Sequence, residues 1–195
     1  MISALRALPR WLMALVVSAV CCFQSVPAQA GAEVKQAMLT QADDGPLLTG
    51  YFALQLSPAL TDAVNHGIPL VFQMQAEVRR PRWYWVDEAV FTANHDRRLT
   101  YNTLVRNYRV SEGAEGRNFQ NLQDALNYVA RPIAWTLPAG AVRVGETVDV
   151  AWRFRLDPAF LPKPFQVVSF GDRDWRLDSD WRNFRLTLPA MAGGR

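Results

Sequence analysis

The stretch LVFQMQAEVRR, from Leu70 to Arg80, has the clearest strand pattern in the chain. Apolar residues occupy every second position, and the positions between them are mostly polar. One face of the extended chain carries Leu70, Phe72, Met74, Ala76 and Val78, and the other carries Val71, Gln73, Gln75, Glu77 and Arg79. Strict alternation of this kind predicts a β-strand with one face in a core and the other largely in water.

The same alternation recurs along the chain, so the sequence predicts several strands. It is clear in YFALQL (51–56), GETVDVAWRFRLD (145–157) and NFRLTL (183–188). Pro81 interrupts any hydrogen-bonded ladder, so we expect a bend or an edge there before WYWVDEAVFTAN (83–94) resumes as strand.

The alternation is interrupted in two other parts of the chain. The alternation slips after Tyr101, which predicts a bulge or a tight turn near Asn102. LPKPF (161–165) is interpreted as a rigid connector, and QVVSF (166–170) as a short apolar segment.

Two short helices are predicted between the strands. Ser57 is the expected N-cap of the first helix, with Pro58 at its first helical position. In the second, apolar residues recur at helical spacing over 119–129, with Asn118 or Asn121 as the cap.

Strands at this spacing with only two short helices favour a mainly β protein. The predicted fold is an immunoglobulin-like or related antiparallel β-sandwich. We expect a signal peptide over 1–30, a flexible leader over 31–46, a single β-sandwich domain over 47–190 and a disordered tail over 191–195. About 165 residues remain after the signal, which suits one domain.

The first thirty residues have the three-part build of an export signal. Two arginines precede an apolar run from Trp11 to Phe23, and the segment ends in small residues at Ala28 and Ala30. We therefore expect export to the periplasm with cleavage after Ala30. The apolar run is shorter than the roughly 20 residues that span a bilayer, which favours removal over a retained anchor. Lipidation at Cys21 is a further alternative.

The composition excludes several kinds of site. Both cysteines, Cys21 and Cys22, lie in the signal, so the mature chain has no disulfide and no thiolate metal ligand. Loss of Arg6 and Arg10 leaves 19 of the 21 basic residues against 18 acidic ones, and this balance gives no reason to expect a nucleic-acid partner. Neither a glycine-rich phosphate loop nor a G-x-S-x-G motif is present, and we expect no catalytic residue and no cofactor.

Two signatures, RPRWYW (80–85) and LPKPFQ (161–166), carry a resemblance to a known family. Together with the signal peptide, they make the chain similar to a proteobacterial family of exported proteins, domain of unknown function 4390. The resemblance covers essentially the whole mature chain. It implies no activity, cofactor or catalytic residue. Genes of this family often stand beside membrane sensor histidine kinases of the nitrogen-regulation type, which implies a link to such a kinase.

Two sets of side chains in the sequence, four aspartates and two histidines, are candidates for metal binding. An acidic run, GDRDWRLDSDW (171–181), offers Asp172, Asp174, Asp178 and Asp180. These carboxylates could bind calcium, but the run lacks the glycine and terminal glutamate of the helix-loop-helix calcium motif, and Arg173 and Arg176 are interleaved. We expect solvated turn acids paired with arginine. His66 and His95 are far apart in sequence, so no metal site is expected from them.

RRPRWYWVDE (79–88) has two interpretations, a ligand platform or a strand rich in large side chains. Large aromatics at alternating positions are more often core than platform, so Trp83 and Trp85 are expected inside the sandwich. The candidate recognition surface consists of Arg80, Arg82, Tyr84 and Asp87. Guanidinium groups suit such a role because they pair with carboxylates and stack on aromatic rings. Asp87 and Glu88 are adjacent on a strand and point to opposite faces, which disfavours them as a pair of hydrolytic carboxylates.

The sequence therefore predicts an exported accessory or regulatory binding module of the cell envelope without enzymatic activity. Its expected partner is another cell-envelope protein. The alternative is a small-ligand or glycan-binding domain that uses exposed aromatics near Trp83 to Trp85 or Trp175 to Trp181, and a hydrolase is the third hypothesis. A flat patch rimmed by arginine favours a protein partner, a concave aromatic patch favours a ligand, and a buried carboxylate with a raised pKa favours catalysis.

Overall fold

The structure of the protein, a computed structural model, describes residues 31–82 and 87–190. The strands are β1 (Gly31–Ala42), β2 (Gly45–Gln55), β3 (Leu70–Arg80), β4 (Glu88–Asn102), β5 (Asn107–Glu112), β6 (Glu115–Phe119), β7 (Ile133–Thr136), β8 (Thr147–Leu156) and β9 (Arg182–Thr187). The α-helices are α2 (Pro58–Asn65), α3 (Leu122–Val129) and α4 (Lys163–Gly171), and two single-turn 3-10 helices, η1 (Pro158–Phe160) and η2 (Arg173–Trp175), flank α4.

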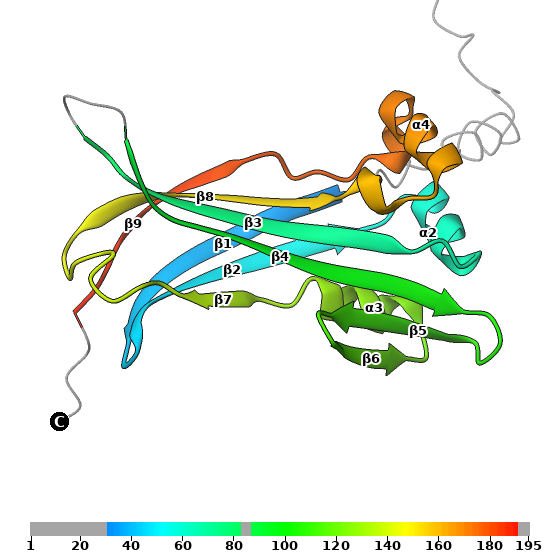
Figure 1. Ribbon diagram of the computed structural model, residues 1–195, viewed down its shortest axis with the longest axis horizontal. Coiled ribbons are helices and arrows are strands. Elements are labelled where there is room, and N and C mark those ends of the chain that lie inside the picture. The colour runs from blue at the N-terminus through cyan, green and yellow to red at the C-terminus, as the bar shows by residue number, and fades with distance from the viewer. Residues whose placement is uncertain (1–30, 83–86, 191–195) are drawn as a thin grey trace, which may run out of the picture.

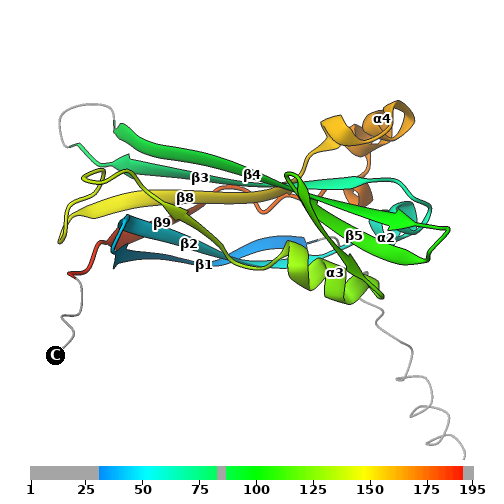
Figure 2. The ribbon, with the colours of Figure 1, turned by 60° about the horizontal axis from the view of Figure 1, so that its bottom comes forward.

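Two antiparallel sheets form the two layers of the molecule (Figures 1 and 2). The smaller sheet has the order β1-β2-β7, and the larger has the order β6-β5-β4-β3-β8-β9. The predicted mainly β, sandwich-like fold is confirmed. No described helix has the length and apolarity needed to cross a membrane.

The core lies between the two sheets and is built around large aromatic rings. The predicted apolar face of β3 is fully buried, from Leu70 to Val78. Trp152 of β8 has no exposed surface, and its ring centroid lies 5.4 Å from that of Phe52 and 4.8 Å from that of Trp135. Because Phe52 and Trp135 come from the smaller sheet, Trp152 joins the two layers.

The two predicted helices form with the expected caps. The Ser57 side chain accepts a hydrogen bond from the backbone N–H of Leu60 at the start of α2, and Pro58 follows it. Asn121, rather than Asn118, caps α3 by accepting from the N–H of Asp124. The predicted turn near Asn102 is also present, between β4 and β5.

The prediction of a flexible leader over 31–46 is wrong, because residues 31–42 form strand β1. Val34, Ala37 and Leu39 are buried in the core, and β1 pairs with β2 along its whole length. The register shifts between Val34 and Gln36, so the strand contains a bulge. A bulge breaks the period of two that the alternation test requires, and it hides the strand in the sequence.

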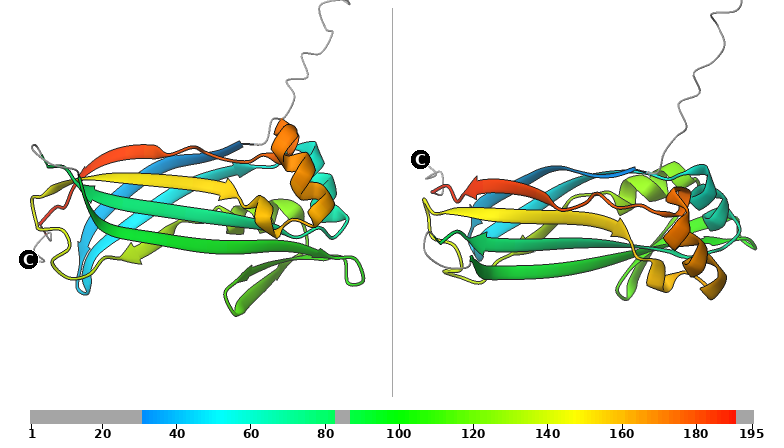
Figure 3. Two further views of the ribbon diagram at one scale, coloured as in Figure 1. Left: turned by 45° about the horizontal axis from the view of Figure 1, so that its top comes forward. Right: turned by 90° about the horizontal axis from the view of Figure 1, so that it is seen from above.

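A third α-helix, α4, forms where a connector and a short apolar segment were expected. Pro164 stands in its first turn, where a missing N–H costs no intrahelical hydrogen bond. Phe165 stacks on Trp175 with ring centroids 5.0 Å apart. This packing ties α4 to η2 and places both at the right-hand end of the molecule in Figure 1 and at its right-hand edge in Figure 3.

Candidate functional site

Arg80, the first residue of the predicted recognition surface, forms hydrogen bonds to other parts of the chain. Its Nη1 donates to Glu88 at 2.9 Å, its Nη2 donates to the carbonyl of Ala141 at 2.9 Å, and its Nε donates to Glu146 at 2.5 Å. These hydrogen bonds from Arg80 lower the pKa of Glu146 and of Glu88. Arg80 therefore holds the end of β3 to the loop before β8.

Arg82 and Asp87 are more open. The backbone N–H of Arg82 donates to Asp87 at 3.3 Å, and its guanidinium pairs with Glu88. Both Arg82 and Asp87 are exposed. Tyr84, the fourth predicted residue, lies outside the described residues, and so do Trp83 and Trp85. The structure thus brings Arg80, Arg82 and Asp87 to one place and gives the first of them a structural role.

A larger polar surface is formed by the side of the six-stranded sheet that faces away from the core. Glu77 of β3 pairs in register with Thr92 of β4 on one side and with Ala151 of β8 on the other. Ala151 in turn pairs with Asn183 of β9. The antiparallel registers therefore align outward-pointing side chains of four strands in rows.

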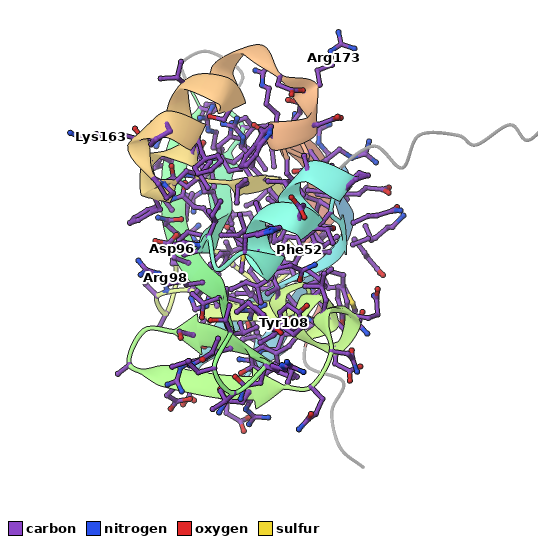
Figure 4. The ribbon with its side chains drawn as sticks, turned by 90° about the vertical axis from the view of Figure 1, so that its right-hand side faces the viewer. Phe52, Asp96, Arg98, Tyr108, Lys163 and Arg173 are labelled. Atoms are coloured by element: carbon purple, nitrogen blue, oxygen red, sulfur yellow. The ribbon has the colours of Figure 1, made fainter. Side chains whose placement is uncertain are left out.

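We call this surface the outer face. It consists of Gln73, Gln75, Glu77 and Arg79 of β3, Thr92, Asn94, Asp96 and Arg98 of β4, Asp149, Ala151, Arg153 and Arg155 of β8, and Asn183 and Arg185 of β9, with Trp181 at its rim. Figure 4 shows two of these residues, Asp96 and Arg98, next to each other at the edge of the molecule on β4.

Four of the five arginines of the outer face are oriented by acidic or amide partners. Arg79 donates to Glu77 at 2.6 Å, and Arg185 donates to Asp149 at 2.9 Å. Arg155 donates through Nε and Nη2 to the same side-chain oxygen of Gln73, at 3.1 and 2.8 Å. Such pairs add little stability at a surface, but they fix the direction of each guanidinium group.

A shallow depression lies in the outer face above Ala151. It has a volume of about 290 Å³ and is lined by Glu77, Arg79, Asp149, Ala151, Trp181 and Asn183. Ala151 has the smallest side chain of its row, and the longer side chains of Glu77 and Asn183 on either side of it form the walls of the depression. Trp181, 38% exposed, forms one wall, and the guanidinium of Arg153 lies 6.0 Å from the centroid of its ring.

The predicted turn aspartates divide between two roles. Asp178 pairs with Arg153 through both carboxylate oxygens, which confirms pairing with arginine but not with the neighbouring Arg173 or Arg176. Burial alone would raise the pKa of Asp178, but the hydrogen bonds from Arg153 and from the N–H of Asp180 outweigh it, and the pKa is lowered. Asp172 accepts from the N–H of Asp174 and caps η2.

A buried charge cluster, not predicted from the sequence, lies on the core side of β4. The side chain of Arg97 is 2% exposed, and its Nη1 donates to the carbonyls of Val129 and Arg131 at 2.7 and 2.9 Å. Glu112 of β5 lies 2.6 Å from Arg131, 3.4 Å from Arg97 and 2.5 Å from His95. The burial of Arg97 could have been inferred from the sequence, because Arg97 alternates with the apolar Leu99 on one face of the strand.

This cluster connects three elements rather than forming a site on the surface. Burial would raise the pKa of Glu112, but the charges of Arg97 and Arg131 outweigh burial and lower it. Burial is also the largest influence on Arg97 and lowers its pKa. The guanidinium of Arg97 satisfies carbonyls at the end of α3, where the helix dipole favours a cation. The cluster therefore fixes α3 and β5 to β4.

The pKa shifts of the described carboxyl groups all have the same direction. Among the described residues, every carboxyl group with a shifted pKa is shifted downward, namely Glu33, Glu88, Glu112, Glu146 and Asp178. A general acid at neutral pH needs the opposite shift. Within the same residues, no three His, Cys, Asp or Glu side chains gather as a metal site would require.

Comparisons with known proteins give one family and one structural likeness. A family model described as "Domain of unknown function (DUF4390)" matches residues 29–185. The crystal structure of Spo0M, a sporulation control protein from Bacillus subtilis, shares 17% sequence identity with the chain at a TM-score of 0.28; the match covers 82% of this chain and 49% of Spo0M. The search of curated proteins gave no match. On the match over 29–185, the chain belongs to the DUF4390 family.

Proposed function

We propose that this protein is an exported, non-enzymatic binding module of the cell envelope, and that its outer face binds another envelope protein. The observation that carries the proposal is the outer face itself. It combines five arginines, four of them oriented by acidic or amide partners, with a half-exposed tryptophan at the rim. Arginine and tryptophan are enriched where proteins bind one another, and both are frequent among the residues that dominate binding energy.

The shape of the outer face supports a protein partner over a small substrate. Its depression above Ala151 is shallow, and the second hollow on this side, lined by Arg153, Arg155, Arg176 and Asp178 among others, has a volume of about 210 Å³. Small-molecule sites are usually deeper and mostly apolar, with volumes of roughly 300–1,000 Å³. The arginine-paired carboxylates likewise support binding rather than acid catalysis. Export is supported by the sequence of residues 1–30.

Site-specific photocrosslinking in intact cells tests the proposal. A photoreactive residue replaces Asn94 on the outer face or, as the matched control, Gln36 on β1 of the opposite sheet; both side chains are exposed. We expect a discrete crosslinked protein from position 94 and none from position 36. The proposal fails if both positions crosslink equally or if only position 36 does. Reversing the charge of Arg98, which shares a strand face with Asn94, should lower the yield from position 94.

Saccharide binding is a second candidate function, and the depression above Ala151 favours it. Sugar rings stack on exposed tryptophan, and their hydroxyl groups bond to carboxylate and amide side chains such as Asp149 and Asn183. Glycan titration followed by tryptophan fluorescence would detect this, with Trp181→Phe as the comparison. A glycan that quenches the wild-type signal but not that of the variant would favour saccharide binding. If the protein binds a saccharide instead of a protein, photocrosslinking in cells should give the same result at positions 94 and 36.

A further inference from the structure

The β4–β5 turn presents two adjacent aliphatic side chains to solvent. Leu104 is 92% exposed and Val105 is 64% exposed. We call Thr103 to Arg106 the aliphatic tip. Most large hydrophobic residues of the described chain are buried or half-buried, so a leucine and a valine side by side in water need an explanation.

The aliphatic tip is held in shape by its own backbone. The side-chain oxygen of Asn102 accepts from the N–H of Leu104 at 2.9 Å and from the N–H of Val105 at 3.3 Å. Arg106 has a φ of 51°, a left-handed conformation that few non-glycine residues adopt. The turn is therefore closed and directs the two aliphatic side chains outward instead of back onto the sheet.

Two arginines lie in or next to the aliphatic tip. Arg106 and Arg109 are exposed, and an open hollow of about 540 Å³ lies beside the tip. Its lining includes Arg109, His66 and the amides of Asn102 and Asn107, and none of its lining residues is acidic. Aliphatic side chains that project beyond arginines fit the interface of a membrane with anionic lipids.

Other exposed apolar and basic side chains lie at the same end of the molecule. Val167 of α4 is 75% exposed and Phe160 of η1 is 46% exposed, and both elements lie at the right-hand end of the molecule in Figure 1. Figure 4, which views that end directly, shows Lys163 and Arg173 at its periphery, where their side chains extend sideways. Three separate chain segments thus bring aliphatic, aromatic and basic side chains to one end.

The chain outside the described residues joins the domain at this end as well. Gly31 pairs with Gln55, the last residue of β2 before α2. The segment that precedes Gly31 contains the apolar run from Trp11 to Phe23. Attachment of this run to a membrane would therefore begin at the end of the domain that carries the aliphatic tip.

We propose that the aliphatic tip docks on a membrane surface that contains anionic lipids, with Leu104 and Val105 inserted among the lipids and Arg106 and Arg109 beside the phosphate groups. This inference is independent of the partner on the outer face. The outer face runs along the side of the molecule, so docking by the end leaves it free for a membrane-attached protein.

Fluorescent labelling with vesicles tests the docking. The chain from Gly31 onward contains every described strand and helix and no cysteine, so the apolar run cannot bind the vesicles and a single introduced cysteine can be labelled. An environment-sensitive dye is placed at Leu104→Cys or, as the control, at Val144→Cys. Val144 is 58% exposed and lies in the loop before β8, at the opposite end.

We expect a blue shift from the label at position 104 with vesicles of phosphatidylglycerol and phosphatidylethanolamine, a smaller shift with phosphatidylcholine, and none at position 144. In unlabelled protein, serine at both 104 and 105 should weaken vesicle binding about tenfold. Arg106→Gln should weaken it on the order of fivefold and reduce its salt dependence. Circular dichroism checks that each variant is folded.

Several results would overturn the docking proposal. An equal shift at both positions, or no shift at position 104, excludes insertion of the aliphatic tip. A shift at position 104 that grows with protein concentration in the absence of vesicles shows that the tip contacts a second copy of the chain instead. Vesicle binding that is unchanged by serine at 104 and 105 shows that another surface binds the lipid.

Discussion

At the scale of single residues, Gly50 on β2 shows how closely the two sheets approach. A Cβ atom at this position would lie 2.8 Å from Trp152 and 2.9 Å from Phe52. Gly50→Ala should therefore lower the free energy of unfolding by about 1 to 3 kcal/mol, because a buried indole has to move. Urea unfolding measures this.

Gly116→Ala is the matched control for this substitution. Its Cβ would meet only the far end of the Arg109 side chain, which can move aside. A loss of stability for Gly116→Ala as large as that for Gly50→Ala would contradict the account of the core around Trp152.

Arg80 and Arg82 are equivalent candidates in the sequence, but they have different roles in the structure. Glu146 and Ala141, which accept hydrogen bonds from Arg80, lie more than 60 residues away in the sequence, so no local pattern could identify them. Arg80→Ala should lower the free energy of unfolding by about 1 to 2 kcal/mol, reduced from a fully buried case by its partial exposure. Arg82→Ala should change stability much less. Equal melting temperatures for the two variants would refute the structural role of Arg80.

Among the elements, β1 is the strand that is least predictable from the sequence. Its buried positions are Val34, Ala37 and Leu39, and the bulge before Gln36 shifts them out of a single alternating series. β3 and β8 contain no such break on their buried face, and both were predicted correctly. Alternation is thus a reliable guide to strands only where the register is uninterrupted.

Truncation distinguishes a strand from a leader. A chain that starts at Asp43 lacks β1 and should lose cooperative unfolding, because Val34 and Leu39 leave the core and β2 loses a hydrogen-bonded neighbour. A chain that starts at Gly31 should keep a single sharp transition. Calorimetry compares the thermal unfolding of the two chains. Equal transitions would show that residues 31–42 are a flexible leader after all.

The attachment of α3 and β5 to β4 should depend on pH through Glu112. Its pKa in the folded protein is lowered from 4.5, so the unfolded chain takes up this proton first as the pH falls. The stability that Glu112 contributes is present above 4.5 and is lost as the pH falls further through the folded pKa. Glu112→Gln should therefore melt lower at neutral pH and lose less stability in acid than the wild type.

Glu33→Gln is the control, since Glu33 pairs with Lys35 at an exposed position on β1. Its melting curves should follow the wild type closely across the same pH range. If Glu112→Gln and the wild type lost the same stability in acid, the cluster around Arg97 would not act as described.

The helix over 163–171 is not predicted by the sequence for two reasons. Proline at 162 and 164 is typical of a rigid connector, and QVVSF (166–170) is an apolar segment too short to show a helical period. Proline is tolerated in the first turn of a helix, however, and the contact between Phe165 and Trp175 supplies the tertiary packing that the local sequence cannot show.

At the scale of the whole molecule, the sequence predicted the layers but not the surface. Alternation in β3, β8 and β9 was enough for the sandwich, and the caps Ser57 and Asn121 were enough for two helices. The outer face depends on registers between strands far apart in the chain, such as Glu77 with Ala151 and Ala151 with Asn183. Registers are set by the assembled sheet, so a single strand read by itself cannot reveal which residues meet.

Two oxidisable side chains on opposite faces allow a direct test of the proposed binding surface. Trp181 at the rim of the outer face is 38% exposed, and Met38 on β1 of the smaller sheet is 39% exposed. Hydroxyl-radical footprinting followed by mass spectrometry reads both in the same molecule, with each residue compared between purified protein and intact cells. If the outer face binds an envelope protein, oxidation of Trp181 falls in cells while that of Met38 is unchanged. Equal oxidation of Trp181 in both settings, or protection of Met38 alone, would contradict the account.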